Sequence, residues 1–164
     1  MDQPAVHLTP PRFAEHPAIV VAGLSQRYDQ QTKHQIAALW QRFVPYMGNI
    51  PGQVGRTSYG LCRNYGAGGS FDYLSAVQVA GSPSLPAELS TFEIPRGIYA
   101  VFSHTDHIST IGHTWMAIFS EWLPASGCTL EEEPNFEVYT DHFDPRSGTG
   151  LVEIWIPLKE GPAA

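Results

Sequence analysis

An internal repeat is the feature of this 164-residue sequence that most restricts its fold. A shift of 79 residues, without gaps, aligns IAALWQRFVPYMG (36–48) with WMAIFSEWLPASG (115–127). The shift also places Pro45 on Pro124 and Gly48 on Gly127. Few residues are identical, but the aligned residues agree in class and in order. Such self-similarity predicts two copies of one structural unit.

The sequence pattern in each copy predicts four elements in the order strand, helix, strand, strand. In the first copy they are expected at 18–24, from Thr32 to Pro45, at 57–63 and at 71–80, with GAGG as the turn between the last two. In the second copy they are expected at 97–104, 107–123, 136–143 and 151–158. The strands are predicted because apolar runs of strand length are bounded by turn residues.

The first helix is predicted from an apolar stripe and from signals at both of its ends. Five apolar residues recur at the spacing of one helix face: Ile36, Leu39, Trp40, Phe43 and Val44. Thr32 followed by Gln35 has the spacing of a capping box, in which the threonine is the N-cap. Pro45 and Gly48 are the predicted stop.

A single four-element unit has one helix for its sheet and little core, so the two copies are expected to pack together. We predict one α+β domain over residues 1–164, with repeat 1 at about 17–80 and repeat 2 at about 95–158. The two repeats are expected to be related by a pseudo-twofold axis. The proline-containing segment 81–95 is the predicted linker. A central ligand groove is expected where the repeats meet.

The charge balance restricts the partners of the chain. The formal net charge is −7, and no basic stripe is visible, which argues against direct DNA binding and against anionic membrane surfaces. The same balance favours cationic partners. No apolar stretch approaches a membrane span, and the first residues lack the pattern of a secretory signal, so we expect a cytoplasmic protein. Cys62 and Cys128 are predicted to be free thiols.

The last predicted strand, LVEIWIPL (151–158), carries a glutamate among apolar residues. Strand alternation places Glu153 and Trp155 on one face and the aliphatic Ile154 and Ile156 on the other, which is expected to pack under the helices. A carboxylate beside a large aromatic ring suits an organic cation, through charge neutralisation and cation–π contact. A solvent-facing glutamate on an ordinary amphipathic strand is the alternative.

Six motifs carry a family resemblance: SYGLC, FDYLSAVQV, IPRGIYAVFSH, EWLPASG, PNFEVYTDHFDP and GLVEIWIPL. Together, from about Pro17 to Leu158, they resemble the GyrI-like family, also known as the effector-binding domain of AraC- and MerR-type multidrug-responsive regulators. The resemblance implies a tandem strand–helix–strand–strand fold whose central groove binds small hydrophobic molecules, often cationic and aromatic. It also implies a glutamate in the last strand that meets the positive charge of the ligand, a position that Glu153 matches. Thr105 and Asp106 stand where the family often has a glycine.

Further aromatic residues are candidates for the walls of the groove. Besides Glu153 and Trp155, they are Tyr59, Tyr73, Phe102, Trp115 and Tyr139, of which Tyr59 and Trp115 are preferred. Each of these side chains is also suited to the core, because aromatic residues commonly fill cores. Glu137, in the motif NFEVY, is assigned a structural role instead.

The sequence leaves other functions open. The resemblance also covers hydrolases of reactive cyclopropane-type natural products, for which Glu153 would be the general base and Tyr59 the proton donor. It covers gyrase-inhibiting proteins as well, so a protein partner is a third reading, and a homodimer is compatible with all three. About sixteen residues precede the fold, too few for a DNA-binding module, so we expect a stand-alone domain.

A metal site is not expected, and neither is a cofactor. The histidines His104, His107 and His113 gather near one predicted strand end and helix, without a cysteine or a clear carboxylate partner. A zinc site needs three or four converging ligands.

Overall fold

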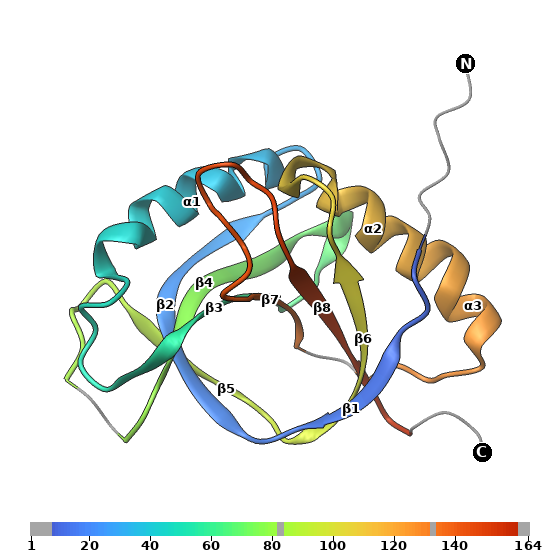
Figure 1. The fold of residues 1–164 in the computed structure, drawn as a ribbon, viewed down its shortest axis with the longest axis horizontal. Helices are drawn as coiled ribbons and strands as arrows, with labels where there is room; N and C mark the ends of the chain where they lie inside the picture. The colour runs from blue at the N-terminus through green and yellow to red at the C-terminus, as the bar shows by residue number, and fades with distance from the viewer. Residues whose placement is uncertain (1–7, 82–83, 132–133, 161–164) are drawn as a thin grey trace.

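The computed structural model describes residues 8–81, 84–131 and 134–160. In that part of the chain, eight strands form one antiparallel sheet in the order β1-β6-β8-β7-β3-β4-β2-β5 (Figure 1). The strands are β1 Arg12–His16, β2 Ile19–Tyr28, β3 Gln53–Arg63, β4 Phe71–Val79, β5 Ser90–Ile94, β6 Gly97–His104, β7 Asn135–Tyr139 and β8 Val152–Leu158. The α-helices are α1 Ile36–Phe43, α2 Ile111–Ala117 and α3 Leu123–Ser126.

The predicted order of strand, helix, strand, strand is confirmed in both halves, as β2-α1-β3-β4 and as β6-α2-β7-β8. The α+β class is confirmed with it. The strand order is symmetric between the two halves. If β1 is exchanged with β5, β2 with β6, β3 with β7 and β4 with β8, the same order is obtained when the sheet is followed from its other edge. This is the order expected of two repeats about a twofold axis, although superposition of the halves is the test of the axis itself.

Two short strands were not predicted from the sequence. β1 lies before the expected start of repeat 1, and β5 lies inside the segment expected to be a linker. Each pairs with the long first strand of the other half, β1 with β6 and β5 with β2. Both are five-residue edge strands with charged or polar residues, which are weak signals of strand pairing.

The helix ends differ from the prediction. Thr32 does not cap the first helix with its side chain; its hydroxyl accepts a hydrogen bond from the Asp29 amide, and a 3₁₀ turn (Lys33–Gln35) leads into α1. The second helix is not continuous, because a π-helical segment, Ile118–Trp122, lies between α2 and α3. Pro124, in the first turn of α3, has no amide to donate to the preceding turn, which explains the wider turn before it.

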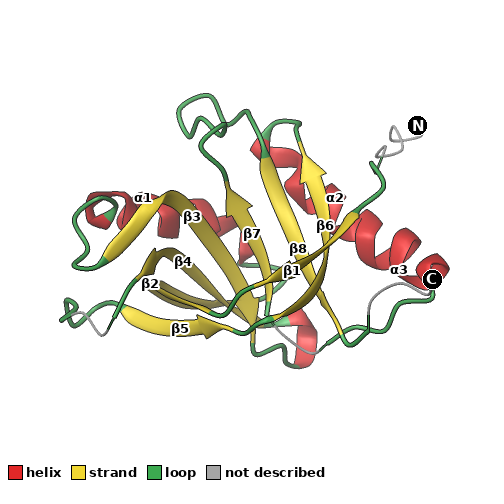
Figure 2. Cartoon of the chain, turned by 60° about the horizontal axis from the view of Figure 1, so that its bottom comes forward, coloured by secondary structure: helices red, strands yellow, loops and turns green. Residues whose placement is uncertain are grey.

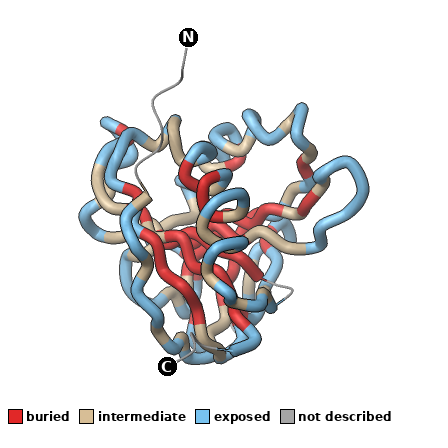
Figure 3. The backbone as a smooth tube through the Cα atoms, turned by 90° about the vertical axis from the view of Figure 1, so that its right-hand side faces the viewer, coloured by how far each residue is buried: buried red, intermediate tan, exposed pale blue. Residues whose placement is uncertain are grey.

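The helices α1 and α2 lie on one face of the sheet, as Figures 1 and 2 show. This face is called the helix side here, and the opposite face is called the strand side. On the helix side, one buried cluster includes Leu39 and Phe43 of α1, and a second includes Ile118 with Ile154 and Ile156 of β8. The expected packing of that face of the last strand under the helices is confirmed. On the strand side, a third cluster holds Tyr59, Tyr99, Phe136 and Trp155. Buried residues therefore line both faces of the central strands. Figure 3 shows the buried stretches of the backbone in red.

Both cysteines are free thiols, as predicted. None of the helices within the described residues is long and apolar enough to cross a membrane.

Candidate functional site

Glu137 is a buried carboxylate near the middle of the sheet. It lies on β7, between β3 and β8, and is 5% exposed. Its neighbours Phe136 and Val138 belong to the cluster on the strand side, so alternation directs the Glu137 side chain to the helix side. An ionised carboxylate at such a place costs free energy unless donors or a cation meet it.

Three side chains donate hydrogen bonds to Glu137. The hydroxyls of Tyr73 and Tyr139 donate to Oε1 at 2.8 and 2.9 Å, and Nε1 of Trp115 donates to Oε2 at 2.8 Å. A fourth residue, Trp40 of α1, donates from Nε1 to the Tyr73 hydroxyl at 3.0 Å. These five residues, named here the Glu137 cluster, join two strands to α1 and α2. Each of the two helices contributes one tryptophan.

A glycine makes room for this arrangement. Gly60 on β3 is the register partner of Glu137. A Cβ atom built on Gly60 would lie 2.0 Å from the Tyr73 hydroxyl oxygen and 2.8 Å from Oε1 of Glu137. The absence of a side chain at this position is therefore what lets the Tyr73 hydroxyl reach the carboxylate.

The electrostatics of the site follow from its burial. Burial raises the pKa of Glu137 above its ordinary value of 4.5, while the three hydrogen bonds and an electrostatic interaction with nearby His104 act against that rise. Burial, together with the negative charge of Glu137, raises the pKa values of Tyr73 and Tyr139 well above 10. Both hydroxyls therefore keep their protons and remain donors at neutral pH.

Aromatic rings surround the carboxylate on the helix side. The rings of Trp40 and Tyr139 meet edge-on, with 4.9 Å between their centres. The rings of Tyr139 and Phe143 also meet edge-on, with 5.1 Å between their centres. On the other flank, Trp115 stacks on Phe119 at 6.1 Å. All five of these aromatic residues are half-buried, whereas Glu137 is buried. The arrangement is a buried carboxylate beneath half-buried aromatic rings, which is suited to a hydrophobic cation.

The predicted site residues fall into three groups. Tyr73, Trp115 and Tyr139 meet at Glu137. Phe102 is fully buried under the second helix, where its ring meets Trp122 at 5.0 Å. Tyr59, Glu153 and Trp155 lie on the strand side, away from the Glu137 cluster. No hydrogen bond joins Glu153 to Tyr59, the pair of the hydrolase alternative, within the described part of the chain.

Glu153 already has a cation beside it. Its side chain is 15% exposed, and its Oε2 lies 2.9 Å from Nη1 of Arg12 on β1. Nε1 of Trp155 donates to Oε1 of Glu153 at 3.3 Å. The predicted pairing of this carboxylate with Trp155 is thus present, with an arginine of the same chain in contact with both.

The sequence analysis assigns Glu137 a structural role and does not place it among the ligand-binding candidates. The signal that could have found it is the one applied to Glu153, a single carboxylate flanked by apolar residues within a predicted strand. In the sequence, Trp40 is assigned only to the apolar face of a helix. The indole N–H of a buried tryptophan needs an acceptor, and this could have been used as a second signal.

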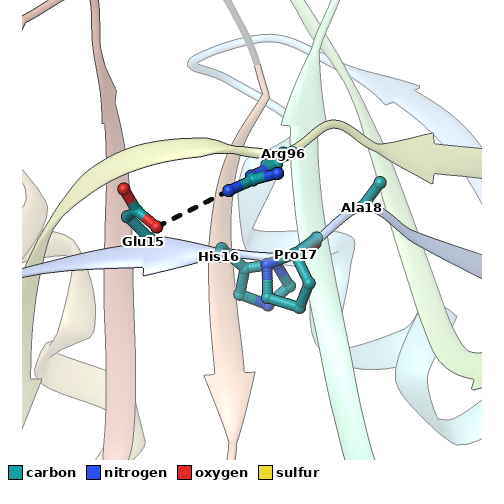
Figure 4. Close-up of a pocket in the computed structure, with 5 residues that line it drawn as sticks. All are labelled: Glu15, His16, Pro17, Ala18 and Arg96. Atoms are coloured by element: carbon teal, nitrogen blue, oxygen red, sulfur yellow. Dashed lines mark hydrogen bonds and ion pairs between the residues drawn. The ribbon is translucent and has the colours of Figure 1, made fainter.

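A hollow of about 410 Å³ lies elsewhere, where β1 passes to β2 beside the turn between β5 and β6 (Figure 4). Its lining residues are Glu15, His16, Pro17, Ala18 and Arg96. None of the predicted site residues lines it. Oε2 of Glu15 lies 3.9 Å from Nη2 of Arg96 in this hollow, and both side chains are largely exposed.

The raised pKa of Glu137 predicts a dependence of stability on pH. The folded protein retains the Glu137 proton to higher pH than the unfolded chain does, so this group stabilises the fold below about pH 4.5, and that contribution is lost as pH rises through the folded pKa. Urea unfolding of the wild type and of Glu137→Gln from about pH 4 to pH 8 measures it. The wild-type free energy of unfolding should fall relative to that of the variant as pH rises. If the difference between the two free energies of unfolding does not change with pH, the raised pKa of Glu137 is contradicted.

Comparison with known proteins supports the fold. The transcriptional regulator BrlR of Pseudomonas aeruginosa is 30% identical over 149 residues, which are 90% of this chain and 54% of BrlR. The chain thus spans about half the length of that relative. The solved structure of SAV2435 bound to tetraphenylphosphonium superposes with a TM-score of 0.72 at 22% identity, covering 92% of this chain and 94% of that one.

The C-terminal domain of EcmrR is also similar in structure, with a TM-score of 0.66 at 16% identity over 95% of this chain and 100% of that domain. At such identities these likenesses show the fold alone. The sequence profile of the GyrI-like small molecule binding domain matches residues 9–159, nearly the whole chain. This chain therefore belongs to the GyrI-like family of small-molecule-binding domains.

Proposed function

We propose that this chain binds hydrophobic organic cations at the Glu137 cluster, on the helix side of the sheet between α1 and α2. The observation that carries the proposal is a buried carboxylate that keeps three hydrogen-bond donors beneath half-buried aromatic rings. The donors favour the ionised form of Glu137, and its burial opposes that form. A bound cation would remove the conflict by neutralising the charge.

The chemistry of the cluster selects for charge and for flat apolar surface together. A cation over a tryptophan or tyrosine face gains about 0.5–2 kcal/mol, with the larger values at desolvated sites. Trp40, Trp115 and Tyr139 are half-buried aromatic residues from two helices and one strand. The complex of SAV2435 with tetraphenylphosphonium makes that cation the natural probe for this chain.

In this proposal Glu137, and not Glu153, meets the charge of the ligand. The two glutamates differ in what already faces them: Glu153 has the guanidinium of Arg12 at 2.9 Å, whereas only neutral donors are hydrogen-bonded to Glu137. A carboxylate held by neutral donors retains its net charge for a ligand. Tyr73, Trp115 and Tyr139 keep the ligand-binding role predicted for them.

The assignments for DNA, for a second copy of the chain and for a protein partner rest on the sequence. The net charge of −7 supports the absence of direct DNA binding by this domain. A homodimer and a protein partner stay predictions from the sequence.

Calorimetric titration with two ions of the same shape tests the proposal. Tetraphenylphosphonium and tetraphenylborate differ mainly in the sign of their charge. The wild type should bind the phosphonium at least about tenfold more tightly, a difference of about 1.4 kcal/mol. Titration at about 0.15 M salt limits the contribution of distant charges. Equal affinity for both ions, or no binding of the phosphonium, would show that Glu137 does not select a cation.

A further inference from the structure

A second carboxylate–aromatic pair lies on the opposite side of the sheet from the Glu137 cluster. Glu153 and Trp155 project from β8 toward the strand side, where Trp155 belongs to the buried cluster that contains no helix residue. Trp155 Nε1 donates to Oε1 of Glu153 at 3.3 Å. The other oxygen of Glu153, Oε2, faces Arg12 at 2.9 Å.

Arg12 satisfies both parts of this pair at once. Its guanidinium contacts the carboxylate, and its Cζ lies 5.6 Å from the centre of the Trp155 ring. A guanidinium that pairs with a carboxylate and lies over an indole is bound as a ligand cation would be. The arginine is thus held by a carboxylate and by an aromatic face together.

Arg12 is much more exposed than the two residues that it contacts, Glu153 and Trp155. Trp155 is 8% exposed. Its ring stacks on that of Phe136, with 5.6 Å between the ring centres, and makes a T-shaped contact with that of His16, with 5.1 Å between the ring centres. The Glu153 side chain is 15% exposed, whereas that of Arg12, at the start of edge strand β1, is 53% exposed. An ion pair with so exposed a partner contributes little to stability, so another cation can take its place.

We propose that Glu153 and Trp155 form a second cation-binding site, specific for planar delocalised cations of the guanidinium and amidinium class, which Arg12 occupies within the chain. The planarity follows from the occupant, because a flat cation can face the indole while its N–H groups reach the carboxylate. The site is separate from the Glu137 cluster and does not rest on the function proposed for it.

Benzamidinium is the probe for this site, and the indole N–H signals in a ¹H–¹⁵N spectrum are the reporters. The wild type, Arg12→Ala and Arg12→Gln are titrated; the glutamine variant retains part of the aliphatic stem. Both substitutions should raise the affinity for benzamidinium at least about fivefold. In both variants, added benzamidinium should shift the Trp155 indole signal. Adding Glu153→Gln to Arg12→Ala should remove that gain.

The Trp115 signal separates this proposal from the one above, because Trp115 donates to Glu137. Benzamidinium that moves the Trp115 signal, and not the Trp155 signal, binds at the Glu137 cluster and overturns the second site. Unchanged affinity after both Arg12 substitutions overturns it as well. So does a gain in affinity that persists without the Glu153 carboxylate.

Discussion

Tetraphenylphosphonium should bind the Glu137→Gln variant at least about thirtyfold more weakly than the wild type, a loss of about 2 kcal/mol. The substitution keeps the size and polarity of the side chain and removes its negative charge. At a buried position that charge is poorly screened by water, so its loss is felt in full by a bound cation. Calorimetric titration of both proteins at neutral pH gives the two affinities.

Glu153→Gln is the matched control, since it makes the same chemical change on the other side of the sheet. It should leave the affinity for tetraphenylphosphonium within about twofold, because Glu153 lies away from the Glu137 cluster and is paired with Arg12. Equal losses in the two variants would indicate a general effect of charge. The Glu137→Gln variant is expected to fold, because removal of a buried charge offsets the imperfect match of an amide to three donors.

The element order could be predicted because the signals for it are local. The strand predicted at 97–104 is β6 itself, and the apolar stripe of the first helix contains the residues that α1 buries. β1 and β5 could not be predicted in this way. Each is stabilised by pairing with a strand of the other half, and that pairing depends on the complete sheet and not on the five residues of the strand.

The site illustrates the same limit. Alternation correctly separates Glu153 and Trp155 from Ile154 and Ile156 in β8, because the period of a strand is set by its backbone. It cannot tell which carboxylate will find an arginine and which will find only neutral donors. Arg12 reaches Glu153 through an unpredicted strand, and the donors of Glu137 come from β4, β7 and α2. Both outcomes depend on tertiary structure.

Gly60→Ala should reduce the free energy of unfolding by about 1–3 kcal/mol, the usual cost of an added methyl group in a close-packed core. The new Cβ would lie 2.0 Å from the Tyr73 hydroxyl oxygen and 2.7 Å from Cζ of the same ring. Tyr73 is 2% exposed and hydrogen-bonded to Trp40 and Glu137, so its ring has little freedom to retreat. Displacement of this ring should also weaken tetraphenylphosphonium binding about tenfold.

Gly97→Ala, on β6, is the control for a glycine in a strand. Its Cβ would meet no atom closer than 3.6 Å, an ordinary contact, so the free energy of unfolding should change by less than about 0.5 kcal/mol. Urea unfolding of the two variants gives the comparison, and equal losses would mean that the Gly60 contact is not responsible.

A second substitution identifies the clashing group. The shortest contact of a Cβ at position 60 is with the Tyr73 hydroxyl, so Tyr73→Phe in the Gly60→Ala protein should recover part of the lost stability. In the wild type, the same Tyr73→Phe change removes a donor from Glu137 and an acceptor from Trp40, so it should be destabilising. A substitution that destabilises one background and stabilises the other has a large coupling energy with Gly60. Independent, additive effects would show that Gly60 is not what admits the Tyr73 hydroxyl to the carboxylate.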